Sequence, residues 1–171
     1  YFYVWSHRKN IGTPLDTGSM LMIAEFDPVH PDRLTSEPKC LSRPLYGFEN
    51  TEHTINNEGP YAFYYHNKIY LAYSGGDARG YLYAIGMLTA NDGDDLCDLS
   101  VWEKAKTPIA SFATIPGEYG PGHNSFFWDR DQNLWIAYHA VTSFEEKIVS
   151  SGMRRVYFEQ DKTPRFDVIV E

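Results

Sequence analysis

A short hydrophobic motif of strand character occurs three times in this chain at nearly constant spacing. The copies are residues 2–6 (Phe-Tyr-Val-Trp-Ser), 70–74 (Tyr-Leu-Ala-Tyr-Ser) and 135–139 (Trp-Ile-Ala-Tyr-His), with offsets of 70 − 2 = 68 and 135 − 70 = 65 residues. Aromatic and β-branched runs bounded by Gly, Asn, Asp and Pro are typical of strands, and no segment of helical length has a 3.6-residue apolar period. A repeat of this length built from strands predicts an all-β fold in which each copy belongs to one blade of a β-propeller.

Further strands are predicted around the motif. An opening strand, at 61–65 and at 125–128, precedes the second and third copies, and a third strand follows each copy, at 20–27, 81–90 and 154–160. The first copy lacks an opening strand, because the chain starts inside the motif. A closed propeller needs at least four blades, and about two and a half are present. We therefore expect residues 1–171 to be the C-terminal part of a single longer propeller domain, with blades opening near 58 and 123.

Composition narrows the class of ligand. Aromatic residues make up 16% of the 171 residues and the net charge is −8, which argues against a surface for nucleic-acid phosphates. No apolar run is long enough to span a membrane, and residues 1–5 lack the pattern of a secretory signal. Aromatic faces stack on sugars and carboxylates accept hydrogen bonds from their hydroxyls, so a neutral, hydroxyl-rich ligand is favoured.

Several other residues are expected to be structural. The two cysteines, Cys40 and Cys97, have no metal-binding spacing. We expect two free thiols, with a disulfide as the alternative. Trp102 is predicted to anchor an outer strand in the core. Arg79 is predicted to pair with Asp77 at the end of a blade, and a direct role in a site is the alternative.

Two ionisable residues stand near the start of successive blades. Glu58 lies in a Thr-Ile-Asn-Asn-Glu-Gly-Pro tract just ahead of the strand at 61–65, and His123 lies in a Tyr-Gly-Pro-Gly-His-Asn-Ser tract. Their offset, 123 − 58 = 65, matches the offset of the motif and predicts the same place in each blade. We expect the two side chains to converge on a shared centre. The alternatives are a solvated acid in a turn for Glu58 and a hydrogen-bonded turn residue for His123.

Several short tracts occur in a distinctive order and spacing. They are 55–60 (Ile-Asn-Asn-Glu-Gly-Pro), 69–74 (Ile-Tyr-Leu-Ala-Tyr-Ser), 77–79 (Asp-Ala-Arg), 86–88 (Gly-Met-Leu) and 120–126 (Gly-Pro-Gly-His-Asn-Ser-Phe). Together they resemble glycoside hydrolase family 43. That family consists of five-bladed propellers that act on arabinose- and xylose-containing plant polysaccharides. The likeness implies an inverting glycosidase, and the Asn-Glu-Gly-Pro and Asp-Ala-Arg tracts favour an α-L-arabinofuranosidase over a β-xylosidase or an arabinanase.

The resemblance implies a mechanism with three carboxylates. The general acid is the Glu of the Asn-Glu-Gly-Pro tract, which is Glu58. The general-base Asp and a second Asp, which tunes the pKa of the acid and orients the sugar, would both precede Tyr1, so neither is in this chain. We expect these 171 residues alone to be inactive for that reason. Glu118, the nearest rival carboxylate, is expected in an exposed loop because Gly and Pro surround it.

The resemblance also implies ligands and a location. His123 would sit on the propeller axis and help to hold calcium or another cation, in part through water, and no organic cofactor is implied. Arg155, 155 − 123 = 32 positions after that His, would contact substrate hydroxyls, although the adjacent Arg154 leaves the assignment ambiguous and a surface ion pair is the alternative. The implied partners are an oligo- or polysaccharide and the missing N-terminal half of the domain, without nucleic acid or membrane. An extracellular location is implied.

Two other classes of function stay open on the sequence. A carbohydrate-binding propeller without catalysis would have the same fold but would lack one of the upstream Asp residues. A propeller that binds peptides usually has repeats of about 40–50 residues, which are shorter than the spacings of 65 and 68 found here.

Overall fold

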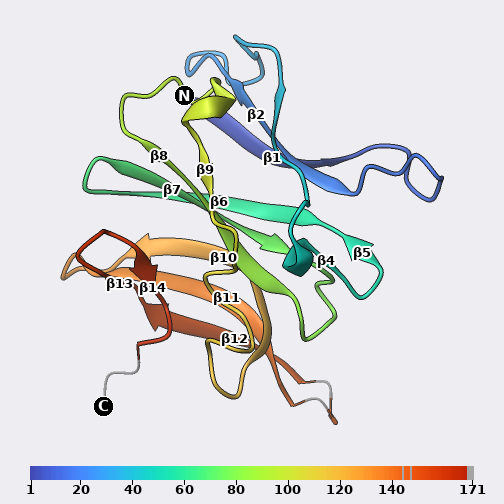
Figure 1. Ribbon diagram of the computed structural model, residues 1–171. Helices are drawn as coiled ribbons and strands as arrows, with labels where there is room; N and C mark the ends of the chain where they lie inside the picture. The colour runs from blue at the N-terminus through green and yellow to red at the C-terminus, as the bar shows by residue number, and fades with distance from the viewer. Residues whose placement is uncertain (144, 147, 169–171) are drawn as a thin grey trace.

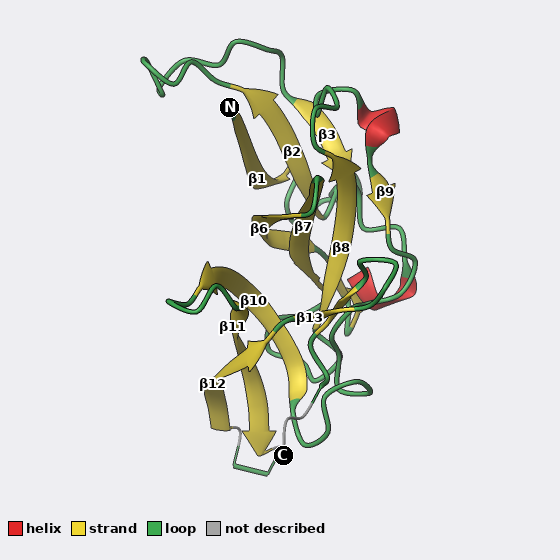
Figure 2. Ribbon diagram, turned by 90° about the vertical axis from the view of Figure 1, so that its left-hand side faces the viewer, coloured by secondary structure: helices red, strands yellow, loops and turns green. Residues whose placement is uncertain are grey.

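Three antiparallel sheets follow one another along the chain (Figures 1 and 2). The computed structural model describes residues 1–143, 145–146 and 148–168. The first sheet has the order β1-β2-β3, the second β6-β7-β8-β9 and the third β10-β11-β12. In Figure 1 they lie one below another from the N-terminus to the C-terminus, so each sheet packs against the next.

The bounds of the elements follow chain order. The first sheet contains β1 (Phe2–Arg8), β2 (Ser19–Glu25) and β3 (Lys39–Ser42). The second contains β6 (Asn57–Tyr65), β7 (Lys68–Gly75), β8 (Ala84–Asn91) and β9 (Glu103–Lys104). The third contains β10 (Tyr119–Trp128), β11 (Leu134–Ser143) and β12 (Ile148–Arg155). Smaller elements are two 3₁₀ turns, η1 (Gly47–Glu49) and η2 (Leu99–Val101), and the pairs β4 (Asn50–Thr51) with β5 (Thr54–Ile55) and β13 (Tyr157–Phe158) with β14 (Pro164–Arg165).

The repeated motif occupies the same strand of each sheet. Its three copies form β1, β7 and β11, so the strand prediction for 2–6, 70–74 and 135–139 is confirmed. In the described part of the chain β1 pairs only with β2, whereas β7 and β11 each lie between two neighbours. Among the described residues, no strand of the first sheet takes the place that β6 and β10 have in the other two.

Two strand predictions need correction. The opening strands are longer than predicted, since β6 and β10 begin at Asn57 and Tyr119 and so contain Glu58 and His123 rather than following them. The third strand of the last sheet was placed at 154–160, but β12 ends at Arg155 and begins six residues earlier. Alternation of half-buried and exposed residues along β12 is regular, but its Ser and Gly residues have low strand propensity and conceal it. Phe144 and Lys147, in the tract that joins β11 to β12, lie outside the described residues.

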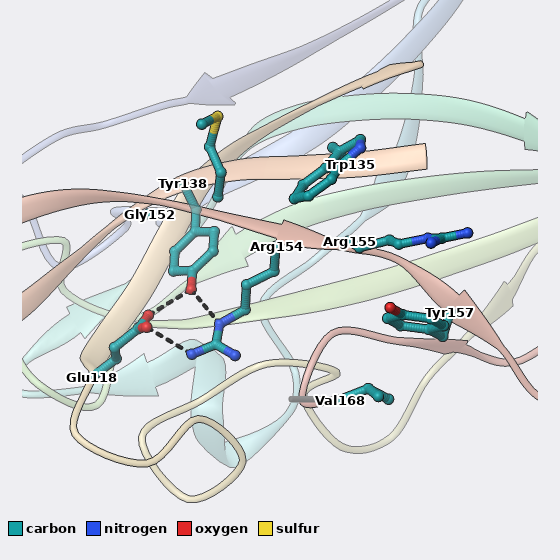
Figure 3. Close-up of a pocket in the computed structure, with 9 residues that line it drawn as sticks. Glu118, Trp135, Tyr138, Gly152, Arg154, Arg155, Tyr157 and Val168 are labelled. Carbon is teal, nitrogen blue, oxygen red and sulfur yellow. Dashed lines mark hydrogen bonds and ion pairs between the residues drawn. The ribbon is translucent and has the colours of Figure 1, made fainter. Parts of the chain in front are cut away.

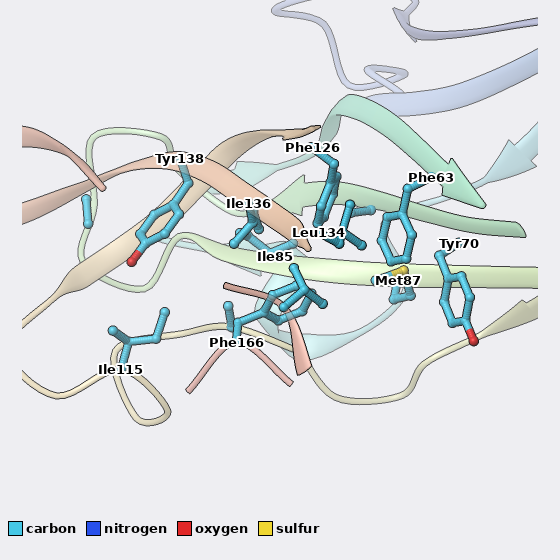
Figure 4. Close-up of a cluster of buried hydrophobic side chains, with 14 residues drawn as sticks. Phe63, Tyr70, Ile85, Met87, Ile115, Phe126, Leu134, Ile136, Tyr138 and Phe166 are labelled. Carbon is cyan, nitrogen blue, oxygen red and sulfur yellow. The ribbon is translucent and has the colours of Figure 1, made fainter. Parts of the chain in front are cut away.

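Two hydrophobic clusters join the three sheets. One lies between the first and second sheets and is built on Leu21, Leu71, Tyr73 and Leu88, with Trp102 packed against it as predicted. The larger cluster lies between the second and third sheets, and Figure 4 shows it; its members include Phe63, Tyr70, Ile85, Met87, Phe126, Leu134, Ile136 and Phe166. Burial of these side chains, at about 1.5–3 kcal/mol each, fixes the faces along which neighbouring sheets meet.

A buried carboxylate in η1, the turn between the first two sheets, is bound to the second sheet. Glu49 is fully buried and forms an ion pair with Lys104 of β9. Its oxygens also accept hydrogen bonds from the Tyr73 hydroxyl at 2.7 Å and the Asn57 amide at 2.9 Å. The backbone N–H groups of residues 45 and 46 complete the set at 2.7 and 2.8 Å. Because every partner is in place, a charge that burial would otherwise disfavour is fully paired.

The cysteines and the outer loops behave as predicted. Cys40 and Cys97 are both free thiols, and Cys97 is buried, so the disulfide alternative is wrong. Arg79 pairs with Asp77 and its side chain is 90% exposed. No helix in the described residues is long and apolar enough to cross a membrane.

The buried ion pair gives a stability prediction for the complete polypeptide that contains these residues. Glu49→Gln leaves the Lys104 ammonium, with its side chain only 15% exposed, without a counter-charge. We expect the free energy of unfolding to fall by about 3–5 kcal/mol. Glu159→Gln is the matched control, because its partner Arg165 is 44% exposed and such surface pairs contribute less than about 1 kcal/mol. Equal losses in urea denaturation of the two variants would contradict the role of Glu49.

Candidate active site

Both inner strands contain a β-bulge at the predicted site. In β6, Glu58 pairs with Ser74 and Tyr61 pairs with Ala72, so β6 has one residue more than β7 over this interval. In β10, Gly122 pairs with His139 and Ser125 pairs with Ala137, which again leaves one extra residue. A bulge bends its strand and redirects the side chains beside it. Each of the two inner strands therefore has a β-bulge at the same end of its sheet.

The bulges correct the predicted equivalence of Glu58 and His123. In the second sheet Glu58 pairs with Ser74. In the third sheet His139 takes the place of Ser74 and pairs with Gly122. The residue equivalent to Glu58 is therefore Gly122, and His123 corresponds to Gly59. Gly59 and His123 both have left-handed backbone conformations, with φ of 56° and 52°. The two sites are offset by 122 − 58 = 64 residues rather than 65, because the turn from β10 to β11 is longer than that from β6 to β7.

Glu58 and His123 nevertheless lie together. The Tyr83 hydroxyl donates a hydrogen bond to Glu58 Oε1 at 2.7 Å and lies 3.5 Å from His123 Nδ1. A Cβ on Gly59 would be 3.6 Å from the His123 ring, so the imidazole covers the backbone next to the acid. Glu58 is half-buried and His123 is exposed, whereas Tyr83 is fully buried. Burial and the nearby Glu58 carboxylate raise the pKa of Tyr83 well above its ordinary value, so Tyr83 is a neutral donor.

His139 is the second histidine of this cluster. Its ring stacks on Tyr83 with centroids 5.7 Å apart and lies 6.2 Å from the His123 ring. Burial lowers the pKa of His139, and His123 lowers it further, while Glu58 and the Ala78 backbone act in the opposite direction. Sequence reasoning missed Tyr83 and His139. The signal for His139 was present, because it ends the repeated motif where the preceding copy has Ser74.

Arg155 lies apart from this cluster. Arg155 of β12 pairs with Trp135 of β11. This pair lies four residues along the strands from the pair His139–Ser151, a distance of about 13 Å. Its guanidinium lies over the Tyr157 ring, 5.1 Å from the centroid. The structure does not bring Arg155 together with Glu58 and His123, so we leave it out of the site.

Arg154 and Glu118 form a separate polar group at a cavity of about 610 Å³ beside β12 (Figure 3). Arg154 donates to Glu118 at 2.8 Å and to the Tyr138 hydroxyl at 2.8 Å, and Tyr138 donates to the other Glu118 oxygen. The expectation of an exposed Glu118 is wrong, since its side chain is 22% exposed and ion-paired. The Gly and Pro residues around Glu118 correctly predicted a loop. They gave no sign that Arg154 of β12 pairs with Glu118 there.

The donor set near His123 limits what metal these residues can bind. Across the described ranges no group of three or more His, Cys, Asp and Glu side chains is placed to hold a metal ion together. His123 is exposed and offers one imidazole nitrogen. Because calcium takes six to eight oxygen ligands, His123 would supply at most one ligand to such a cation, and the others would be water or groups from elsewhere.

Comparison with known proteins identifies the family. The family model of glycosyl hydrolases family 43 matches residues 1–164. The chain belongs to this family. An extracellular exo-α-(1→5)-L-arabinofuranosidase of Streptomyces avermitilis is 29% identical over 163 residues, which cover 91% of this chain and 33% of that protein. The protein of the same description from Streptomyces chartreusis is 35% identical over 126 residues, which cover 73% of this chain and 37% of that protein.

Solved structures give the same result for the fold. The α-L-arabinofuranosidase of Lactobacillus brevis is 30% identical, has a TM-score of 0.81, and is matched over 96% of this chain and 51% of that one. A thermostable family-43 glycoside hydrolase is 26% identical with a TM-score of 0.69 over 86% of this chain and 46% of that one. The all-β propeller class is confirmed. This family 43 chain spans about a third of the length of its curated relatives.

The lowered pKa of His139 gives a prediction about pH. The pKa of His139 is lower in the folded state than its ordinary value of 6.5. Below about pH 6.5 this histidine therefore binds a proton more readily in the unfolded chain, and the folded state loses stability as the pH falls. We expect His139→Asn, in the complete polypeptide, to reduce the drop in thermal midpoint between about pH 7.5 and about pH 5. Asn substituted for the exposed His30 is the control, and a pH dependence equal to wild type in both variants would exclude His139 as a cause.

Proposed function

We propose that this chain is part of a glycoside hydrolase that acts on arabinose-containing polysaccharides, with Glu58 as its general acid. Family membership and the named arabinofuranosidases among the relatives support the class. The observation that carries the residue assignment is the bulge of β6, where a half-buried carboxylate has one oxygen held by Tyr83. The finer proposal is an inverting α-L-arabinofuranosidase with an extracellular location; two of the relatives are described as extracellular arabinofuranosidases.

The proposed chemistry begins at the glycosidic oxygen. Glu58 gives its proton to that oxygen while the bond to the anomeric carbon breaks, so the leaving group departs as a neutral alcohol. Water then attacks from the opposite face of the sugar, and a second carboxylate accepts its proton. In an inverting enzyme the two carboxyl groups are about 6.5–9.5 Å apart. We propose that this base, and the Asp that tunes the acid, come from outside these 171 residues.

A carbohydrate-binding propeller without catalysis is the second candidate. It is favoured only if the upstream part of the polypeptide lacks either of the two Asp residues. The geometry around Glu58 supports the enzyme, because binding alone does not require a half-buried carboxylate with one oxygen held by a buried hydroxyl.

We also propose that His123 supplies one ligand to a central cation, calcium in the first instance. The support is its exposed imidazole beside Glu58 and Gly59. A cation there would add positive charge beside the site, while the residues of this chain hold the acid and orient it.

The acid assignment predicts a dependence on the leaving group. Glu58→Gln, in the complete polypeptide, should keep sugar binding but lower kcat on an unactivated arabinoside by about 10²–10⁴-fold. The loss should be much smaller on a dinitrophenyl arabinoside, whose leaving group departs without protonation. Glu118→Gln is the control, because Glu118 belongs to the separate group with Arg154. Equal losses of Glu58→Gln on both substrates would contradict the acid role.

The cation proposal is checked by stability as well as by activity. We expect His123→Ala to lower the thermal midpoint and to abolish the difference between calcium-loaded and chelator-treated protein, because one ligand is lost. The chemical step should change less than in Glu58→Gln. His30→Ala, an exposed histidine on the loop after β2, should keep the wild-type response. An unchanged response to calcium in His123→Ala would show that the imidazole is not a ligand.

A further inference from the structure

Tyr83 is buried next to the proposed acid and was not among the residues that the sequence indicated. It stands directly before β8 and is fully buried. Its hydroxyl is the donor that reaches Glu58 Oε1 at 2.7 Å. A fully buried tyrosine whose hydroxyl meets a half-buried carboxylate is a candidate for a role in the chemistry of that carboxylate.

A chain of hydrogen bonds fixes the direction in which Tyr83 donates. The backbone N–H of His123 donates to Ser74 Oγ at 2.8 Å, and a backbone N–H can only donate. Ser74 is fully buried, and its hydroxyl lowers the pKa of Tyr83, as a hydrogen-bond donor to the phenol oxygen does. Because Ser74 accepts from the backbone, its hydrogen is available to Tyr83, and the one hydroxyl hydrogen of Tyr83 is then available to Glu58.

Two contacts hold the Tyr83 ring in place. A Cβ on Gly122 would lie 2.1 Å from the ring, so only glycine leaves room for Tyr83 at this crossing of β10. On another side the ring stacks on His139, at an angle of 11° between the planes. The hydroxyl therefore has little freedom to move away from Glu58.

We propose that Tyr83 is a positioning residue that selects which oxygen of Glu58 carries the catalytic proton. Oε1 accepts from Tyr83, so the proton of the neutral acid resides on Oε2, which is left to meet the glycosidic oxygen. When the bond to the anomeric carbon breaks, its electron pair goes to the glycosidic oxygen, the proton moves there from Oε2, and Glu58 becomes a carboxylate. The bond from Tyr83 strengthens as that charge develops. This inference rests on the proposed function of Glu58.

The test is Tyr83→Phe in the complete polypeptide, with Tyr70→Phe as the matched control. Tyr70 is also buried, but it pairs with Phe63, five residues beyond Glu58 along β6, and its hydroxyl donates to the Lys162 carbonyl instead of to Glu58. We expect Tyr83→Phe to lower kcat on an unactivated arabinoside by about 10- to 100-fold, the range for a hydrogen bond to a charged group, with little change in KM. The alkaline limb of the pH profile should move to higher pH, because a donor to the ionised carboxylate is gone. Ser74→Ala should move it in the same direction and by less.

The outcomes separate this inference from the function on which it rests. If Tyr83→Phe and Tyr70→Phe lose similar activity, with unchanged pH profiles and equal losses on the unactivated and dinitrophenyl substrates, Tyr83 is only structural and the inference is overturned. If Glu58→Gln itself shows no leaving-group dependence, the acid assignment fails first. A shifted alkaline limb and a larger loss on the unactivated substrate in Tyr83→Phe, absent from Tyr70→Phe, support the positioning role.

Discussion

The buried carboxylate of Glu49 is the interaction on which the geometry near the acid depends. It ties Lys104 of the outer strand β9 to Tyr73 of β7 and to Asn57, the residue directly before Glu58. The other side of Asn57 accepts from Ser42 of the first sheet at 2.9 Å. One ionised group therefore holds β7, β9 and the start of β6 together, and Asn57 extends the network to the first sheet. Such a network is stable only when complete, because a buried charge without partners is strongly disfavoured.

The β-bulges of β6 and β10 place the polar side chains of the site on this rigid framework. An inner strand that ran without interruption would point alternate side chains to the two faces of its sheet and none along the axis. The extra residue in β6, next to Glu58, and the extra residue in β10, at His123, break that alternation at the same level. Both strands then present polar groups toward one another, while Phe63 and Phe126 farther along the same strands remain in the core.

Features that repeat along the chain could be predicted from the sequence, whereas contacts between distant segments could not. The motif copies placed β1, β7 and β11 correctly because their aromatic and aliphatic residues favour strands wherever they recur. Glu58 and His123 were found because each lies in a Gly-rich tract before an aromatic run. Their register was misjudged by one residue, since turn length is not visible in an offset. Glu49, Tyr83 and the partner of Glu118 were not predicted, because contacts between distant segments leave no local pattern. Arg155 was placed by resemblance alone.

The fit of Gly122 against Tyr83 has a consequence for how such a domain can evolve. The two residues belong to different blades, and position 122 cannot carry a side chain while Tyr83 is in place. A blade taken from a relative with a side chain at the Gly122 position would collide with the tyrosine of its new neighbour. Blades of this propeller are therefore not interchangeable modules. Recombination would have to exchange adjacent blades as a pair to keep the acid in place.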